Sequence, residues 1–213
     1  MDCCQCQGIE GFFNEREAAR SLKRYHRDGP ARSTRVLLDA LRATRVEGAT
    51  LLDIGGGVGA IPLDLLSAGV TSATDVDASS AYIAAARAEA ARQGFGDRMA
   101  YQHGNFVALA PAIAPADIVT LDRVICCYHD VQALVQASAS KARRLYGLVY
   151  PRDSWFSGVL SAVANTLFRL RKNPFRIFAH RTRTIESLLR NAGLERRFQR
   201  NVGLWRVAIY VRP

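Results

Sequence analysis

The sequence of 213 residues lacks any apolar run near the roughly 20 residues that a membrane-spanning helix needs. Residues 1–20 carry acidic side chains where a secretory signal has a cationic start and an apolar centre. We therefore expect a cytoplasmic protein without a membrane-spanning helix. The length predicts one domain, because single domains mostly reach about 250 residues before they split.

Lysine is scarce, and acidic residues are scarce in the last third of the chain. Only three of the 29 basic residues are lysine. Residues 141–213 carry 16 basic and three acidic residues, a net charge of +13, whereas residues 1–140 carry 13 and 16, a net charge of −3. The basic part is either a solvated arginine surface or a binding face for an anionic ligand or surface.

The five cysteines are an odd number, which argues against a disulfide framework. Cys3, Cys4 and Cys6 crowd the N-terminus, and Cys126 and Cys127 are adjacent. Structural zinc sites space their cysteines in separated pairs, so no metal site is expected. Thiol chemistry at these cysteines stays open.

Hydrophobic spacing predicts helices over residues 11–29 and 30–46, which we expect to form an N-terminal helical lid at residues 1–45. Short buried strands then alternate with helices. The expected strands are 49–54, 70–77, 98–105, 116–124 and 144–151, and the helices between them are 60–69, 79–94 and 130–142. This alternation predicts an α/β fold with a doubly wound parallel sheet, whose core spans residues 46–151.

A helix over 182–193 and two strands at 194–201 and 202–212 predict a terminal hairpin at the edge of the sheet, so residues 184–213 close the single domain. The segment 152–183 begins apolar and turns basic. It is interpreted as a substrate cap, as a membrane-surface element, or as core with a solvated face. In the first interpretation Arg176, Arg181 and Arg183 are the candidate substrate-binding residues, since arginine binds carboxylates through two hydrogen bonds.

Glycine dominates the loop after the first expected strand, in "LLDIGGGVGAIPLDLL". Gly55, Gly57 and Gly59 follow Asp53 at alternate positions, where missing side chains let the backbone turn sharply and approach a ligand at a helix N-terminus. A dinucleotide fingerprint also fits, as Gly55, Gly57 and Ala60. The loop alone does not decide between these cofactors.

Polar residues close to the ends of three expected strands help to decide which kind of cofactor the loop would bind. Asp53 suits a ligand with an ammonium group, and Asp77 can accept hydrogen bonds from two ribose hydroxyls. Asn105 can contact the edge of an adenine ring. Together they describe a site for a nucleoside that carries an amino acid.

Four segments, "LLDIGGGVGAI", "DVDASSAYIAAAR", "HGNF" and "ADIVTLDRVICCYHD", resemble in order and spacing the motifs of class I S-adenosylmethionine-dependent methyltransferases. The resemblance covers residues 46–151. It implies a Rossmann-like sheet of seven strands, the last antiparallel and inserted by a hairpin, and S-adenosyl-L-methionine as cofactor. It places Asp53 and the glycines by the methionine part, Asp77 on the ribose and Asn105 beside the adenine. Phe106 and Asp122, which lie in two of these motifs, complete the candidate cofactor-binding residues.

A looser resemblance over nearly the whole chain is to magnesium-protoporphyrin O-methyltransferases, which methylate a tetrapyrrole propionate. That family has a His-Tyr pair after the fourth strand, where this chain has Cys127 and Tyr128, with His129 one step later. The resemblance implies a small acceptor, anionic and partly apolar, that is methylated on oxygen. Candidate catalytic residues are Tyr25, Tyr128 and His129, with neutral His129 as the base if the acceptor is a hydroxyl or an amine.

Other functions stay open. The cysteines fit a thiol or metalloid acceptor, a nitrogen acceptor is possible, and the cofactor site could serve a non-catalytic binding protein. RNA binding is not expected, because aromatic residues do not alternate with the arginine cluster. Peripheral membrane contact is an alternative for the basic segment, and the sequence predicts no oligomeric state.

Overall fold

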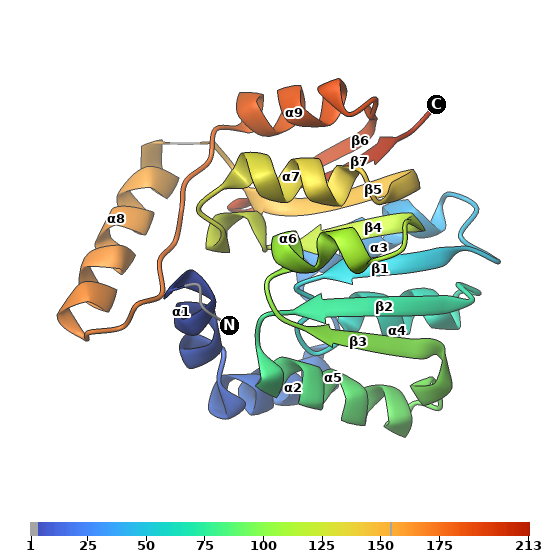
Figure 1. The fold of residues 1–213 in the computed structure, drawn as a ribbon, viewed down its shortest axis with the longest axis horizontal. Coiled ribbons are helices and arrows are strands. Elements are labelled where there is room, and N and C mark those ends of the chain that lie inside the picture. Colours follow the sequence, from blue (N-terminus) through green and yellow to red (C-terminus); the bar gives the residue numbers. More distant parts are fainter. Residues whose placement is uncertain (1–3, 154) are drawn as a thin grey trace.

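The computed structural model describes residues 4–153 and 155–213, so the expectation for Cys3 and for the thiols of Cys4 and Cys6 lies outside what it describes. Its centre is a sheet of seven strands in the order β3-β2-β1-β4-β5-β7-β6 (Figure 1). The strands are β1 (Thr50–Ile54), β2 (Ser72–Asp77), β3 (Met99–His103), β4 (Ala116–Asp122), β5 (Ala142–Pro151), β6 (Glu195–Val202) and β7 (Trp205–Val211).

The first five strands are parallel to one another, and β7 runs antiparallel to both β5 and β6. The predicted doubly wound sheet with a terminal antiparallel hairpin is therefore confirmed. The strand order reverses between β1 and β4, because β1 leads outward to β2 and β3 while β4 leads to β5. Ligands of such sheets bind beyond the carboxyl ends of the strands at this reversal.

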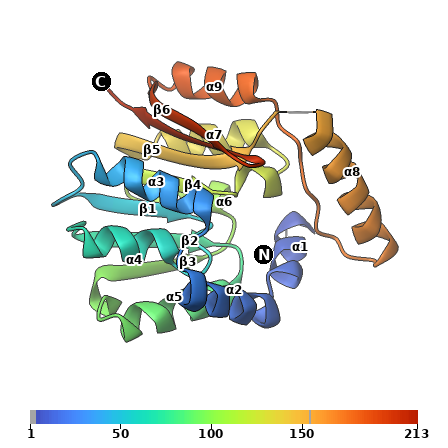
Figure 2. The same ribbon diagram turned by 180° about the vertical axis from the view of Figure 1, so that it is seen from behind.

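Helices cover both faces of the sheet (Figures 1 and 2). Apolar side chains of α3 (Arg32–Arg42) and α4 (Ala60–Ser67) are buried on one face. Those of α6 (Phe106–Leu109), α7 (Val131–Ala139) and α9 (Thr182–Asn191) are buried on the other. The remaining helix of the core, α5 (Ser80–Arg92), packs along β2 and β3.

The predicted helix over 11–29 is wrong in its extent, because the chain forms two helices there, α1 (Cys4–Phe12) and α2 (Glu15–Asp28). Asn14 separates them. It has extended backbone angles, and its side-chain oxygen accepts hydrogen bonds from the N–H groups of Arg16 and Glu17. An asparagine in this role caps the start of a new helix. The apolar residues keep a helical spacing on both sides of Asn14, so their periodicity alone did not reveal the break.

The expected lid is smaller than residues 1–45. Leu37, Leu38 and Leu41 of α3 are buried against one face of the sheet and belong to the core. Of the expected lid, α1 lies beyond the ends of the strands and α2 lies beside α5 (Figure 2). Polar contacts hold α2 against α5, with Ser21 Oγ 2.9 Å from Tyr82 Oη and His26 Nε2 2.8 Å from Glu89 Oε2.

The segment after β5 contains a helix that the sequence analysis did not predict, α8 (Trp155–Leu170). It lies at the outer side of the molecule beside α1, away from the sheet, in both views (Figures 1 and 2). Lys172 ends it in a left-handed conformation (φ 53°), and the N–H of Asn173 donates to the carbonyl of Phe168, as in a Schellman motif. Within the described parts of the chain, no helix combines the length and apolarity that crossing a membrane requires.

Candidate active site

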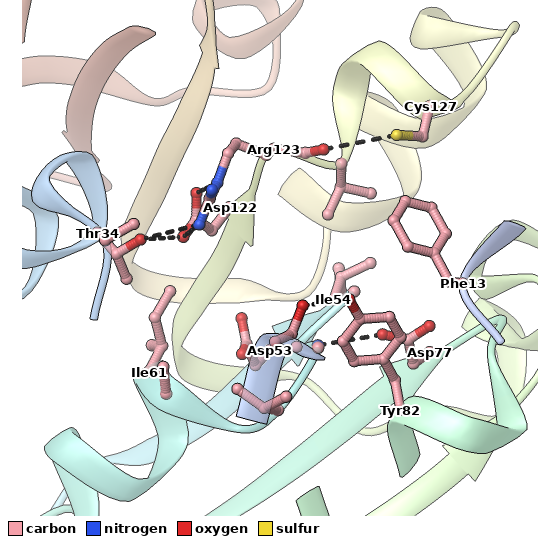
Figure 3. Close-up of a pocket in the computed structure, with 18 of the residues that line it drawn as sticks. Phe13, Thr34, Asp53, Ile54, Ile61, Asp77, Tyr82, Asp122, Arg123 and Cys127 are labelled. Carbon is pink, nitrogen blue, oxygen red and sulfur yellow. Dashed lines mark hydrogen bonds and ion pairs between the residues drawn. The ribbon is translucent and has the colours of Figure 1, made fainter. Parts of the chain in front are cut away.

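A cavity of about 980 Å³ lies at the carboxyl ends of β1, β2 and β4, beneath α1 and α2 (Figure 3). Its volume is at the upper end of the roughly 300–1,000 Å³ of small-molecule sites. The lining combines the glycine loop, aromatic side chains of the lid and the segment that follows β4. A cavity of this size at the reversal of strand order is the expected place for a nucleoside cofactor with a second molecule beside it.

The loop between β1 and α4 turns through glycines in the left-handed region. Gly55, Gly57 and Gly59 have φ of 69°, 59° and 82°. A Cβ at Gly55 would in addition lie 2.5 Å from a methyl carbon of Val124. Gly55 and Gly57 line the cavity, whereas Gly59 is the N-cap of α4 and packs against Ala86 outside it.

Gly56 is a residue of this loop that the sequence analysis missed. Its N–H donates to Asp75 Oδ1 at 3.2 Å. A Cβ here would lie 2.5 Å from that oxygen and 2.9 Å from Asp53 Oδ2. The run of three glycines at 55–57 was the signal in the sequence for this close approach. Gly56 has an ordinary φ, so it is needed here because its backbone lies against other atoms and not because of its backbone conformation.

Three carboxylates gather behind the loop, on Asp53, Asp75 and Asp77, and all three are buried. Asp53 Oδ1 accepts a hydrogen bond from Thr120 at 2.6 Å, while Asp53 Oδ2 has no partner among the described residues. Burial, reinforced by neighbouring carboxylates, raises the pKa of Asp53 to about 7 and that of Asp77 to about 6. Burial, together with the carboxylates of Asp77 and Asp53, holds the pKa of Asp75 well above its ordinary range. This concentration of buried acid favours a ligand that brings positive charge.

Asp77 and Asn105 both line the cavity, after the ends of neighbouring strands. Asp77 Oδ1 accepts from Ser79 N–H at 2.8 Å and Oδ2 from Gly57 N–H at 3.1 Å, which fixes the carboxylate at the end of β2. Asn105 caps α6, and its Oδ1 accepts from Tyr128 Oη at 3.0 Å. Phe106 follows it and also lines the cavity.

Asp122 joins the end of β4 to α3. Its Oδ2 accepts from Thr34 Oγ1 at 2.5 Å, and its Oδ1 pairs with Arg123 Nε at 3.0 Å. Arg123 has φ of 62°, which is uncommon for a residue other than glycine, and its guanidinium lies over the ring of Trp205. The cavity is lined by all four of these side chains, Thr34, Asp122, Arg123 and Trp205. The sequence carried no signal for Arg123, because its place depends on α3 and β7.

Two of the three candidate catalytic residues line the cavity, and the third does not. Tyr25 of α2 and Tyr128 line the cavity. His129 stacks on Tyr128 with ring centroids 5.4 Å apart, but its side chain is exposed and it does not line the cavity. The expected general base is therefore not placed where the acceptor would bind.

The arginines expected to bind substrate are also elsewhere. Arg176 donates to the carbonyls of Asn173 and Phe175, Arg181 lies beside a separate cavity of about 210 Å³, and Arg183 is exposed. None of the three lines the large cavity. Its arginines come from the lid, from α3 and from the end of β4: Arg24, Arg32, Arg35 and Arg123.

Cys126 and Cys127 both line the cavity, with their sulfur atoms 3.9 Å apart. Both thiols donate toward the carbonyl of Arg123. The hydrogen bond from Cys127 lowers the pKa of Cys126, and the pair raises the pKa of Cys127 well above its ordinary range. Among the described residues no group of three or more histidine, cysteine or acidic side chains could hold a metal ion.

Comparisons with known proteins agree with this architecture. Residues 51–145 match the family model described as a methyltransferase domain. No curated protein matches the sequence. Magnesium protoporphyrin IX methyltransferase from Synechocystis PCC 6803, crystallised with bound SAH, has a TM-score of 0.75 at 19% identity, covering 98% of this chain and 100% of that one.

Two further solved structures have the same fold. An O-methyltransferase family protein from Burkholderia thailandensis has a TM-score of 0.70 at 19% identity, covering 96% of this chain and 63% of that one. A putative sarcosine dimethylglycine methyltransferase from Galdieria sulphuraria has a TM-score of 0.67 at 14% identity, covering 85% of each chain. Residues 51–145 therefore match a methyltransferase domain, and the similar solved structures show that the chain has the fold of these methyltransferases.

Proposed function

We propose that the protein methylates a small, anionic and partly apolar acceptor on oxygen. The observation that carries this proposal is the composition of the cavity at the carboxyl ends of the strands. Its donor side holds the glycine loop and the buried carboxylates, and its other walls combine apolar side chains with four arginines. An acceptor with an apolar body and a carboxylate matches those walls, because arginine binds a carboxylate through paired, charge-assisted hydrogen bonds.

The residues of the donor side fit S-adenosylmethionine. Asp53 Oδ2 is buried without a partner among the described residues, and a cationic group would satisfy it. Asp77 has both oxygens fixed by backbone N–H groups and retains acceptor capacity for ribose hydroxyls. Asn105 and Phe106 would lie against the adenine. When bound, the cofactor supplies a methyl group activated by the positive charge on sulfur.

The protein's part in the reaction is alignment and exclusion of water. The lid residues Phe12 and Phe13 and the aromatic ring of Phe175 cover the cavity with apolar surface. A carboxylate is already a nucleophile, so this acceptor needs no general base. Tyr25 of α2 and Tyr128, which follows β4, would position the acceptor, and the exposed His129 takes no part.

The magnesium protoporphyrin IX methyltransferase among the similar structures supports a tetrapyrrole carboxylate as one acceptor to test. The experiment is a panel of acidic, partly apolar metabolites, including tetrapyrroles, incubated with the protein and S-adenosylmethionine. Formation of S-adenosylhomocysteine and of a methyl ester is expected with a carboxylate acceptor. Turnover restricted to neutral amines or to thiols would contradict the proposal.

One observation favours a second candidate function, the methylation of a thiophilic acceptor such as a trivalent metalloid. Cys126 and Cys127 present two sulfur atoms 3.9 Å apart in the cavity wall. Two adjacent thiols suit a soft acceptor. Including arsenite in the panel tests this alternative.

A further inference from the structure

We propose that α8 is an amphipathic helix that docks the protein on an anionic membrane surface. Four large apolar side chains of this helix are exposed: Val159 (52%), Val163 (53%), Leu167 (47%) and Leu170 (76%). Their spacings of four, four and three residues place them on one side of the helix, and we call them the α8 stripe. The other exposed large apolar side chain in the described residues is Leu204, far along the chain.

The stripe faces outward because the opposite side of α8 is anchored. Asn165 Nδ2 donates to the carbonyl of Ile177 at 2.7 Å, and Asn165 Oδ1 accepts from the Ile177 N–H at 2.8 Å. Phe168 packs edge-on against Phe12 and Phe175, with centroids 5.4 Å away in each case. These contacts fix the rotation of the helix and leave the stripe without cover.

The positive charge around the α8 stripe indicates that its binding partner is an anionic surface. Residues 154–185 contain six arginine or lysine residues and no aspartate or glutamate. Arg169, Arg171 and Lys172 are exposed at the end of α8 that carries Leu167 and Leu170. An apolar stripe beside a cluster of cations is the pattern of helices that lie in the headgroup region of anionic membranes. A second copy packed with its α8 parallel would bring these cations toward those of its partner, which repels, whereas an anionic surface attracts them.

Docking through α8 would place the cavity beside the membrane. Phe12 and Phe175 line the cavity, and Phe168 of α8 packs on both. A partly apolar acceptor dissolved in the membrane would then meet the protein at its site. The docking proposal goes beyond the proposed function, since membrane binding is measured without any acceptor.

The test is co-sedimentation of the full chain with vesicles of phosphatidylcholine alone and of phosphatidylcholine with phosphatidylglycerol. We expect binding to the anionic vesicles that weakens with added salt. The double variant Val163→Gln/Leu167→Gln removes two apolar side chains from the stripe and should weaken binding about tenfold or more. The matched control Ala162→Gln/Thr166→Gln places the same residues on exposed positions beside the stripe and should bind within about twofold of the wild type, by the same reasoning.

A third variant, Arg169→Gln/Arg171→Gln/Lys172→Gln, should lose most of the preference for anionic vesicles and of the salt dependence. Circular dichroism and donor binding check that each variant is folded. Absence of wild-type binding to anionic vesicles, or equal loss in the stripe and control variants, would overturn the proposal. A stripe-dependent dimer in sedimentation velocity, without vesicle binding, would assign the stripe to a second copy and would also overturn it.

Discussion

Gly56 packs directly on the carboxylate of Asp75, with its N–H donating to Asp75 Oδ1 at 3.2 Å and no room for a side chain. A Cβ there would lie 2.5 Å from that oxygen. The donor loop is thus held by a buried acid in the neighbouring strand, and its shape depends on the absence of one carbon atom.

The first prediction follows from this contact. Gly56→Ala should destabilise the protein by about 1–3 kcal/mol, the usual cost of overpacking, and should weaken donor binding. Chemical denaturation and isothermal titration with S-adenosylhomocysteine measure the two effects. Gly11→Ala is the control, because nothing lies within 4 Å of a Cβ there. Normal donor binding by Gly56→Ala would contradict the close packing.

The second prediction concerns stability and pH in the absence of ligand. Because burial raises the pKa of Asp53 to about 7 and of Asp77 to about 6, the folded state binds more protons than the unfolded state between pH 4 and these values. The free energy of unfolding should therefore fall as pH rises from about 4.5 to about 7.5, by about 5 kcal/mol if both carboxyls titrate at these values.

Urea denaturation at a series of pH values measures this slope. Asp75→Asn keeps an oxygen for the Gly56 N–H and removes one acid from the group, so it should flatten the slope. A free energy of unfolding that rises over this interval in the wild type would show that the three carboxylates are ionised in the folded protein at low pH.

The third prediction concerns proton release. A cationic ligand beside Asp53 stabilises its ionised form and lowers its pKa, so binding of S-adenosylmethionine near pH 6.5 should release protons, and affinity should rise with pH through this range. Titration calorimetry in buffers of different ionisation enthalpy measures the release. Asp77→Asn should weaken binding about tenfold or more by losing a charge-assisted acceptor. Binding of NADH in place of the methyl donor would contradict the donor assignment.

The fourth prediction distinguishes the two sets of arginines. Arg24→Gln and Arg32→Gln should each raise KM for an anionic acceptor by about 10-fold, because a charge-assisted hydrogen bond is worth about 1.5–3 kcal/mol. Arg183→Gln should leave KM unchanged, because Arg183 lies outside the cavity. Steady-state kinetics with the acceptor found in the panel measure both. A larger effect from Arg183 would favour Arg176, Arg181 and Arg183 as the substrate-binding arginines.

The fifth prediction concerns the thiols. Replacement of Cys126 and Cys127 by serine preserves two small side chains and should leave methylation of a carboxylate acceptor within about threefold of the wild type, since serine differs little in volume. Product formation under reducing conditions is the measurement. Loss of turnover with intact donor binding would favour the thiophilic acceptor instead.

The sequence by itself determined the layers of the fold. Apolar strands alternating with helices can bury their faces only in a parallel sheet covered on both sides, and the terminal hairpin follows from two strands with a short turn. The meeting of Asp53 and Asp77 in one cavity was also predictable, because residues at the ends of neighbouring parallel strands lie at one edge of the sheet.

Only the tertiary structure decided what faces the donor. The break at Asn14 turns one predicted helix into two, and Arg24 of α2 and Arg32 of α3 line the cavity. Arg181 and Arg183 have the same guanidinium group but do not line this cavity. Periodicity fixes which side of a helix is apolar, whereas the direction of a helix after a loop depends on contacts between residues far apart in the chain. Those contacts, such as Phe168 on Phe12, are what place the lid and α8.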